Sequence, residues 1–137
     1  MERDSHSDDE IRQILSLKNV VVIGMSQDSR KAAHAIPRYL SENDYEITPV
    51  NPNADEILGK KCFDDISQVE DKIDIVDVFR PSDQVLPIVT EAIKKNPKVI
   101  WLQEGIHNEE AELLARNAGI KVVFNRCMFA EHQRLGL

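Results

Sequence analysis

Features that assign a chain to a specialised class are scarce in this sequence of 137 residues. The apolar run Val20–Ile23 is followed at once by Gly24 and polar residues, and no stretch is long enough to span a bilayer. The first six residues are polar and acidic, so they cannot form the apolar core of a signal peptide. We therefore expect a cytoplasmic protein whose two cysteines, Cys62 and Cys127, are reduced thiols without a disulfide.

Positively charged residues are outnumbered as well. The chain has 17 lysines and arginines against 24 acidic residues, which gives a net charge of −7. Nucleic acids and anionic membranes need positive potential, so neither is an expected partner. A small-molecule ligand remains, with a homo-oligomer or a protein partner as open possibilities. The length fits a single domain, with an N-terminal helix in residues 1–18, opened by a Ser7–Glu10 capping box, and a core in residues 19–137.

Short apolar strands alternate with helical segments along the rest of the chain. The predicted strands cover residues 19–24, 46–51, 61–63, 74–79, 98–102 and 121–124, and the third is a short edge strand. The alternation predicts an α/β, Rossmann-like three-layer sandwich, in which a parallel sheet of five or six strands carries helices on both faces. The fold type implies the strand order 3-2-1-4-5-6.

Basic side chains follow several of these strands, at the edge where parallel strands of this fold bind ligands. Arg30 and Lys31 follow the first strand, Arg80 the fourth and Arg126 the last. The first of these loops also leads into a helix N-terminus, whose free N–H groups favour an anion. Together these features predict a ligand with several phosphates.

The fingerprint of a dinucleotide site is missing. Of Gly-x-Gly-x-x-Gly only Gly24 is present, since positions 26 and 29 are serine, and the second strand ends in Asn51-Pro52 without a carboxylate for a ribose diol. No P-loop pattern occurs either. NAD is therefore disfavoured, although a nicotinamide-dependent oxidoreductase stays as an alternative.

The stretches that carry a family resemblance are Val22–Ser26, His34 with Tyr39-Leu40, Val50–Pro52, Leu58-Gly59, Val78–Pro81, Trp101–Ile106, Asn108–Ala111, and Arg126–Met128 with Glu131-His132. In this order the chain resembles, from about Asn19 to Leu135, the stand-alone CoA-binding domain proteins related to the N-terminal domain of the succinyl-CoA synthetase α subunit. The resemblance implies a non-catalytic module that binds, senses or carries coenzyme A or an acyl-CoA at the carboxyl edge of the sheet. An accessory subunit of an acyl-CoA synthetase is a second alternative.

The expected contacts combine the resemblance with the side chains that follow the strands and with His34, at the start of a helix. They are Gly24, Ser26, Arg30, Lys31, His34, Asn51, Pro52, Phe79, Arg80, Pro81, Gln103, Gly105, Asn125 and Arg126. The chain departs from the family at Lys31, where arginine is more usual and would offer a bidentate fork. A surface salt bridge is the alternative role for Arg80.

No catalytic residue or metal site is predicted. His107 is expected to be a loop residue, because the phosphorylated histidine of the synthetase belongs to a second domain. No two of the four histidines share ligand spacing with a cysteine or carboxylate pair. For Cys127, the neighbouring Arg126 and a following helix start would lower the thiol pKa and permit a mixed disulfide with CoA, while a buried apolar role is the alternative.

Overall fold

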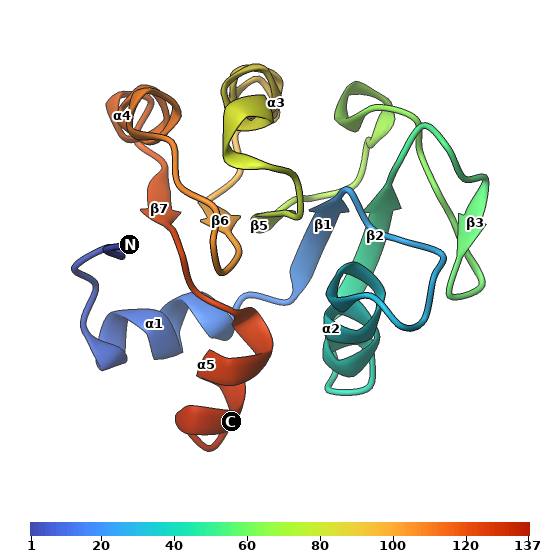
Figure 1. Ribbon diagram of the computed structural model, residues 1–137, viewed down its shortest axis with the longest axis horizontal. Coiled ribbons are helices and arrows are strands. Elements are labelled where there is room, and N and C mark those ends of the chain that lie inside the picture. The colour runs from blue at the N-terminus through green and yellow to red at the C-terminus, as the bar shows by residue number, and fades with distance from the viewer.

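Five parallel strands form the central sheet of the computed structural model, which describes all residues from Met1 to Leu137 (Figure 1). The strand order is β2-β1-β5-β6-β7. The bounds are β1 Asn19–Ile23, β2 Glu46–Val50, β5 Ile75–Val78, β6 Val99–Leu102 and β7 Lys121–Val123. The predicted Rossmann-like α/β fold is confirmed. None of the helices combines the length and the apolar composition needed to cross a membrane.

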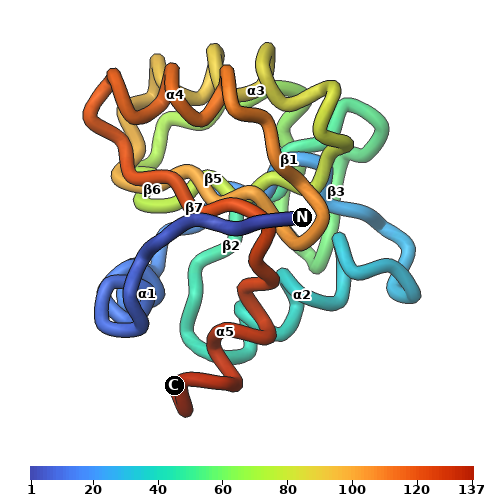
Figure 2. Tube along the Cα trace, turned by 60° about the vertical axis from the view of Figure 1, so that its left-hand side comes forward, coloured from blue at the N-terminus to red at the C-terminus, as the bar shows by residue number.

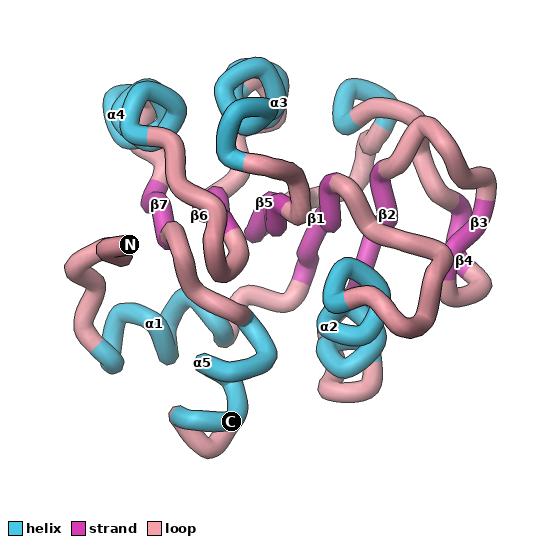
Figure 3. The backbone as a smooth tube through the Cα atoms, viewed as in Figure 1, coloured by secondary structure: helices cyan, strands magenta, loops and turns pink.

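The predicted edge strand 61–63 is replaced by a hairpin and a single bridge. Strands β3 (Glu56–Ile57) and β4 (Lys60–Lys61) pair with each other in a separate antiparallel sheet, at the right of Figure 3. Leu58 and Gly59 both have positive φ angles, which is the geometry of a tight hairpin turn. Because the chain reverses there, only Phe63 reaches the main sheet, through a parallel bridge to Val50.

Helices cover both faces of the sheet. Helices α3 (Val85–Ile93) and α4 (Glu109–Asn117) lie on one face, and α1 (Asp8–Leu15), α2 (Ala32–Ser41) and α5 (Met128–Arg134) lie on the other (Figure 1). Successive strand residues face opposite sides, so each strand contributes to two hydrophobic cores of 19 and 17 buried residues. This explains why the strands are continuous apolar runs.

The sequence predicts Ser82 as the N-cap of the helix after β5, but Ser82 does not cap α3. Residues Ser82–Gln84 form a 3₁₀ turn, and the α-helix begins only at Val85. The Ser82 hydroxyl instead accepts a hydrogen bond from the backbone N–H of His107 at 3.0 Å. It therefore ties the β5–α3 connection to the loop after β6.

The N-terminal segment runs beside the edge strand β7 before α1 begins (Figure 2). The Asp4 carboxylate accepts from the N–H of Phe124 at 3.0 Å, and His6 Nε2 lies 3.0 Å from the carbonyl oxygen of Val122. These side chains satisfy backbone groups that an open sheet edge leaves unpaired. The predicted capping box of Ser7 and Glu10 is present at the start of α1.

Candidate functional site

A cleft of about 300 Å³ opens where β1, β2 and β5 end, beside helix α3. Strand β1 lies between β2 and β5, so the chain connections leave it in opposite directions, as at the switch point of Rossmann-like sheets. The lining residues are Ile23, Gly24, Val50, Pro52, Asp64, Asp65, Ile66, Arg80, Pro87, Ile88 and Glu91. Three predicted contacts, Gly24, Pro52 and Arg80, therefore meet in one depression.

Gly24 is required by a close approach of two backbone segments. Its φ angle is +85°, and a Cβ atom built there would lie 2.4 Å from the carbonyl oxygen of Phe79. Its N–H also donates to the carbonyl of Val50 at 2.9 Å. The residue therefore holds the ends of β1, β2 and β5 together at the floor of the cleft.

Replacing Gly24 with alanine should destabilise the protein more than the same change at Gly59. Both glycines have positive φ, so both variants incur the left-handed strain of about 1–2 kcal/mol. Only Gly24 adds a clash with rigid backbone, since a Cβ at Gly59 meets nothing within 4 Å. We expect an extra loss of at least about 2 kcal/mol for Gly24→Ala in urea unfolding. Equal losses of stability in Gly24→Ala and Gly59→Ala would contradict this expectation, because they would mean that the strand ends can move apart without a cost in free energy.

Arg80 is the one basic side chain in the cleft lining. It is half-buried and shares the cleft with three carboxylates, those of Asp64, Asp65 and Glu91, without an ion pair to any of them. Glu91 pairs instead with Lys94 at 2.6 Å. The guanidinium is therefore available to a ligand, and Pro81 lies exposed beside it.

The loop between β1 and α2 leads into the N-terminus of α2, and no acidic side chain in the first turn offsets the partial positive charge of that N-terminus. Lys31 occupies the N-cap position of α2 without a side-chain hydrogen bond, and the first turn has no acidic residue. Arg30 is exposed and forms two hydrogen bonds with Asp28, both at 3.0 Å. An exposed pair of this kind contributes little stability, so Arg30 can exchange its partner for a stronger anion.

Ser26 and His34 shape this loop from within. His34 is buried, and its Nδ1 lies 2.8 Å from the carbonyl oxygen of Ser26. Because a carbonyl only accepts, Nδ1 carries the proton. The Ser26 hydroxyl accepts from the N–H of Asp28 at 3.0 Å. Both predicted contacts therefore fix the loop conformation.

Three predicted amide side chains brace the neighbouring turns. Asn51 donates to the Met25 carbonyl at 2.8 Å, and Asn125 accepts from the Gly105 N–H at 2.7 Å. Gln103 is buried and donates to Asp77 at 2.6 Å. None of the three lines the cleft. Phe79 packs partly buried against the core beneath α2 and α5.

Arg126 is not part of the predicted basic group. Its side chain is only 3% exposed and pairs with the carboxylate of Asp4 at 2.8 Å, with Glu131 at 3.9 Å. The expectation of four cations at one edge is therefore corrected to three. The physical reason is that the N-terminal segment returns to β7 and neutralises Arg126 inside the protein.

Burial is the main cause of the pKa shifts of two titratable groups near the sheet edge. Burial raises the pKa of Asp77 to about 7, against the hydrogen bond from Gln103. Burial also raises the pKa of the Cys127 thiol, and hydrogen bonds from the N–H groups of Ala130 and Phe129 oppose it only in part. The expected lowering of the Cys127 pKa is therefore wrong. Both cysteines are free, as predicted.

Besides the strand-end residues Ile23 and Val50, six cleft residues were not among the predicted contacts. They are Asp64, Asp65, Ile66, Pro87, Ile88 and Glu91. Asp65 and Gln68 form a capping box around the 3₁₀ turn Ile66–Gln68, so the acidic pair was detectable only as a local cap. The α3 residues carry no local signal, because which face of a helix lines a cleft depends on packing.

Comparison with known proteins agrees with the fold. The family model described as "CoA binding domain" matches residues 18–133. The uncharacterized protein YneT of Bacillus subtilis is 35% identical over 124 residues, which are 90% of this chain and 92% of that protein. An ADP-forming acetate–CoA ligase of Methanocaldococcus jannaschii is 36% identical over 129 residues, and the match covers 88% of this chain but 18% of the ligase.

Solved structures show the same relationship. A hypothetical protein from Pyrococcus horikoshii has a TM-score of 0.93 and 38% identity, and the match covers all of both chains. The dinucleotide-forming acetyl-coenzyme A synthetase 1 of Ca. Korarchaeum cryptofilum, solved with phosphate and ADP, has a TM-score of 0.71 and 29% identity, with 83% of this chain and 27% of that chain covered. The resemblance found in the sequence is confirmed, and the chain belongs to the CoA-binding domain family.

Proposed function

We propose that this chain binds coenzyme A or an acyl-CoA at the carboxyl edge of its sheet. The observation that carries the proposal is the unpaired Arg80 in a switch-point cleft, in a chain that belongs to this family. The N-terminus of α2 supplies further N–H groups for an anion, with Lys31 at its cap. The pyrophosphate and the 3′-phosphate of CoA provide the matching negative charge.

The charge pattern suggests how the ligand is divided between cleft and loop. Asp64, Asp65 and Glu91 would repel phosphates placed deep in the cleft. Their carboxylates can accept hydrogen bonds from a base amino group or ribose hydroxyls, while the apolar wall of Ile66 and Ile88 suits a planar base. The phosphates then lie toward Arg80 and the β1–α2 loop.

We further propose a binding, sensing or carrier role without catalysis. The cleft lining holds no histidine, cysteine or serine that could form a nucleophile–base pair. A part in an acyl-CoA synthetase is the second candidate, because the chain matches only a section of the acetate–CoA ligase. Acyl-CoA formation from acetate, ATP and CoA by this chain alone would overturn the non-catalytic assignment.

Calorimetric titration should show CoA binding and no comparable binding of NAD. Replacing Arg80 with alanine should weaken CoA binding by about 1.5–3 kcal/mol, the size of a lost charged hydrogen bond. Arg38→Ala is the matched control, since Arg38 is half-exposed on α2 and pairs only loosely with Glu42 at 3.7 Å. Affinity should also fall as salt rises. Tight NAD binding without CoA binding would contradict the proposal.

A further inference from the structure

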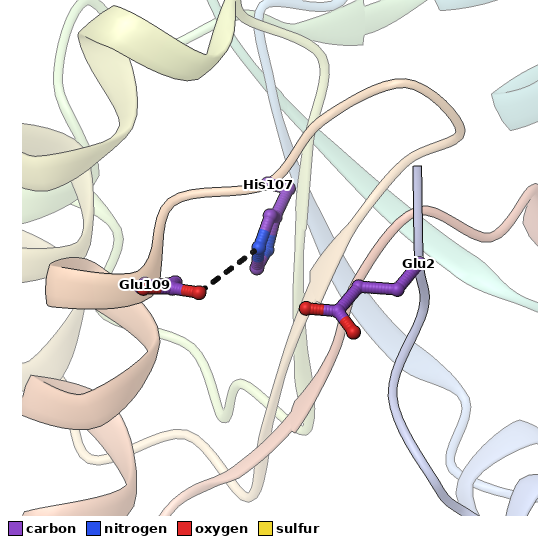
Figure 4. Close-up of side chains that lie close together, drawn as sticks. All are labelled: Glu2, His107 and Glu109. Atoms are coloured by element: carbon purple, nitrogen blue, oxygen red, sulfur yellow. Dashed lines mark ion pairs between the residues drawn. The ribbon is translucent and has the colours of Figure 1, made fainter.

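A second polar cluster lies outside the cleft, where the N-terminal segment meets the loop before α4. Glu2, His107 and Glu109 each offer one ligand atom, and these atoms lie within 4.8 Å of one another. Figure 4 shows the two carboxylates on either side of the imidazole. None of the three residues lines the CoA cleft, so the cluster is independent of the proposed function.

The imidazole of His107 is held in one orientation. Its Nδ1 lies 2.7 Å from Oε2 of Glu112, whose side chain is 2% exposed. Glu112 also accepts from the N–H of Asn108 at 2.7 Å, and the ring of His107 stacks on Phe124 with 4.3 Å between centroids. Because the Glu112 carboxylate only accepts hydrogen bonds, Nδ1 of His107 carries a proton. Nε2 is the ring nitrogen that stays free for another partner.

A neutral imidazole with its proton on Nδ1 leaves Nε2 as an acceptor close to two carboxylates. Glu109 Oε1 lies 3.9 Å from Nε2, which is too long for a hydrogen bond. A divalent metal ion placed among these three acceptors would offset the like charge of the two carboxylates. One imidazole nitrogen with carboxylate oxygens is a ligand set that divalent transition metals accept, with water completing the coordination.

Glu2 is positioned from the opposite side by the turn after β7. The side-chain amide of Asn125 donates to the carbonyl of Glu2 at 3.0 Å, and Asn125 accepts from the Gly105 N–H. The carboxylate of Glu112 behind His107 reproduces the carboxylate–histidine arrangement that orients imidazole ligands in metal sites. We propose that Glu2, His107 and Glu109 bind a divalent transition-metal cation that fastens the N-terminal segment to the start of α4.

The test is zinc titration of the full chain, without CoA and with a non-chelating reductant, at pH 7.5. We expect one zinc ion per chain. The zinc affinity should be at least about ten-fold lower in His107→Ala and in Glu2→Gln. Glu110→Gln is the matched control, because Glu110 is an exposed neighbour in the first turn of α4 and should change nothing. Glu2→Gln alters an exposed residue, so it remains informative if His107→Ala fails to fold.

A second measurement reports the position of the ion. Zinc should slow amide hydrogen exchange in residues 2–6 of the wild type and of Glu110→Gln, but not of Glu2→Gln. No zinc binding would overturn the proposal. Equal zinc affinity in the wild type and both ligand variants would also overturn it, since the ion would then lie elsewhere, for example on Cys62 or Cys127.

Discussion

Replacing Asp77 with asparagine should remove a pH dependence of stability that the wild type shows between about pH 4 and pH 7. The Asp77 side chain is fully buried, and its Oδ2 has no hydrogen-bond partner. Burial raises its pKa from 3.8 to about 7. The folded protein therefore keeps the proton over a range in which the unfolded chain has released it.

The sign follows from proton binding. Below pH 3.8 both states hold the proton and the stabilising contribution is complete, and it is lost progressively as the pH rises to about 7. The wild type should lose about 4 kcal/mol relative to Asp77→Asn across this range. Gln103 can still donate to the retained Oδ1, so the variant should fold.

Urea unfolding of wild type and variant at pH 4, 5.5, 7 and 8 measures the effect. The difference between the two proteins cancels titrations that they share, including that of His132, whose pKa is lowered by burial. Asp71→Asn, at an exposed position, should follow the wild type at every pH. A wild-type-minus-variant difference that is constant with pH would show that folding does not change the pKa of Asp77.

Replacing Asp4 with alanine should destabilise the protein by about 3 kcal/mol, because it leaves a buried arginine without its main partner. Arg126 and Asp4 are 3% and 4% exposed, and their side chains make hydrogen bonds at 2.8 and 3.0 Å. The change also removes the acceptor for the N–H of Phe124. Glu131, at 3.9 Å, is the one carboxylate that remains near the guanidinium, which keeps its hydrogen bonds to the backbone carbonyls of residues 4 and 6 at 3.2 Å.

Asp9→Ala is the matched control. Asp9 pairs with Arg12 at 2.8 Å, but their side chains are 88% and 47% exposed, and the expected loss is below about 0.5 kcal/mol. In a double-mutant cycle, Asp4→Ala combined with Arg126→Met should lose less than the sum of the single changes. Additive losses, or equal losses for Asp4→Ala and Asp9→Ala, would show that the buried pair contributes nothing specific.

Much of the fold and part of the site were predictable from local patterns. The β-branched run of β1 indicates a strand buried on both faces, and Ser7 with Glu10 marks the start of α1. Parallel strands bring their carboxyl ends together, so Gly24, Pro52 and Arg80 could be placed at one edge without coordinates. The pairing of β3 with β4 was not foreseen, because strands of two residues are too short to show a periodic pattern.

By itself, the amino-acid sequence determined the five strands of the main sheet, their parallel order and the strand ends that form the cleft. These depend on periodicity and on turn residues, which act over a few positions. Only the tertiary structure decided the partners of charged side chains. Asp4 lies 122 positions from Arg126, and Glu2 lies beside His107 from the far end of the chain. Many cations and carboxylates look equivalent in the sequence, and only the packing of distant segments decides which of them become neighbours. Burial then changes the pKa of the groups that packing encloses.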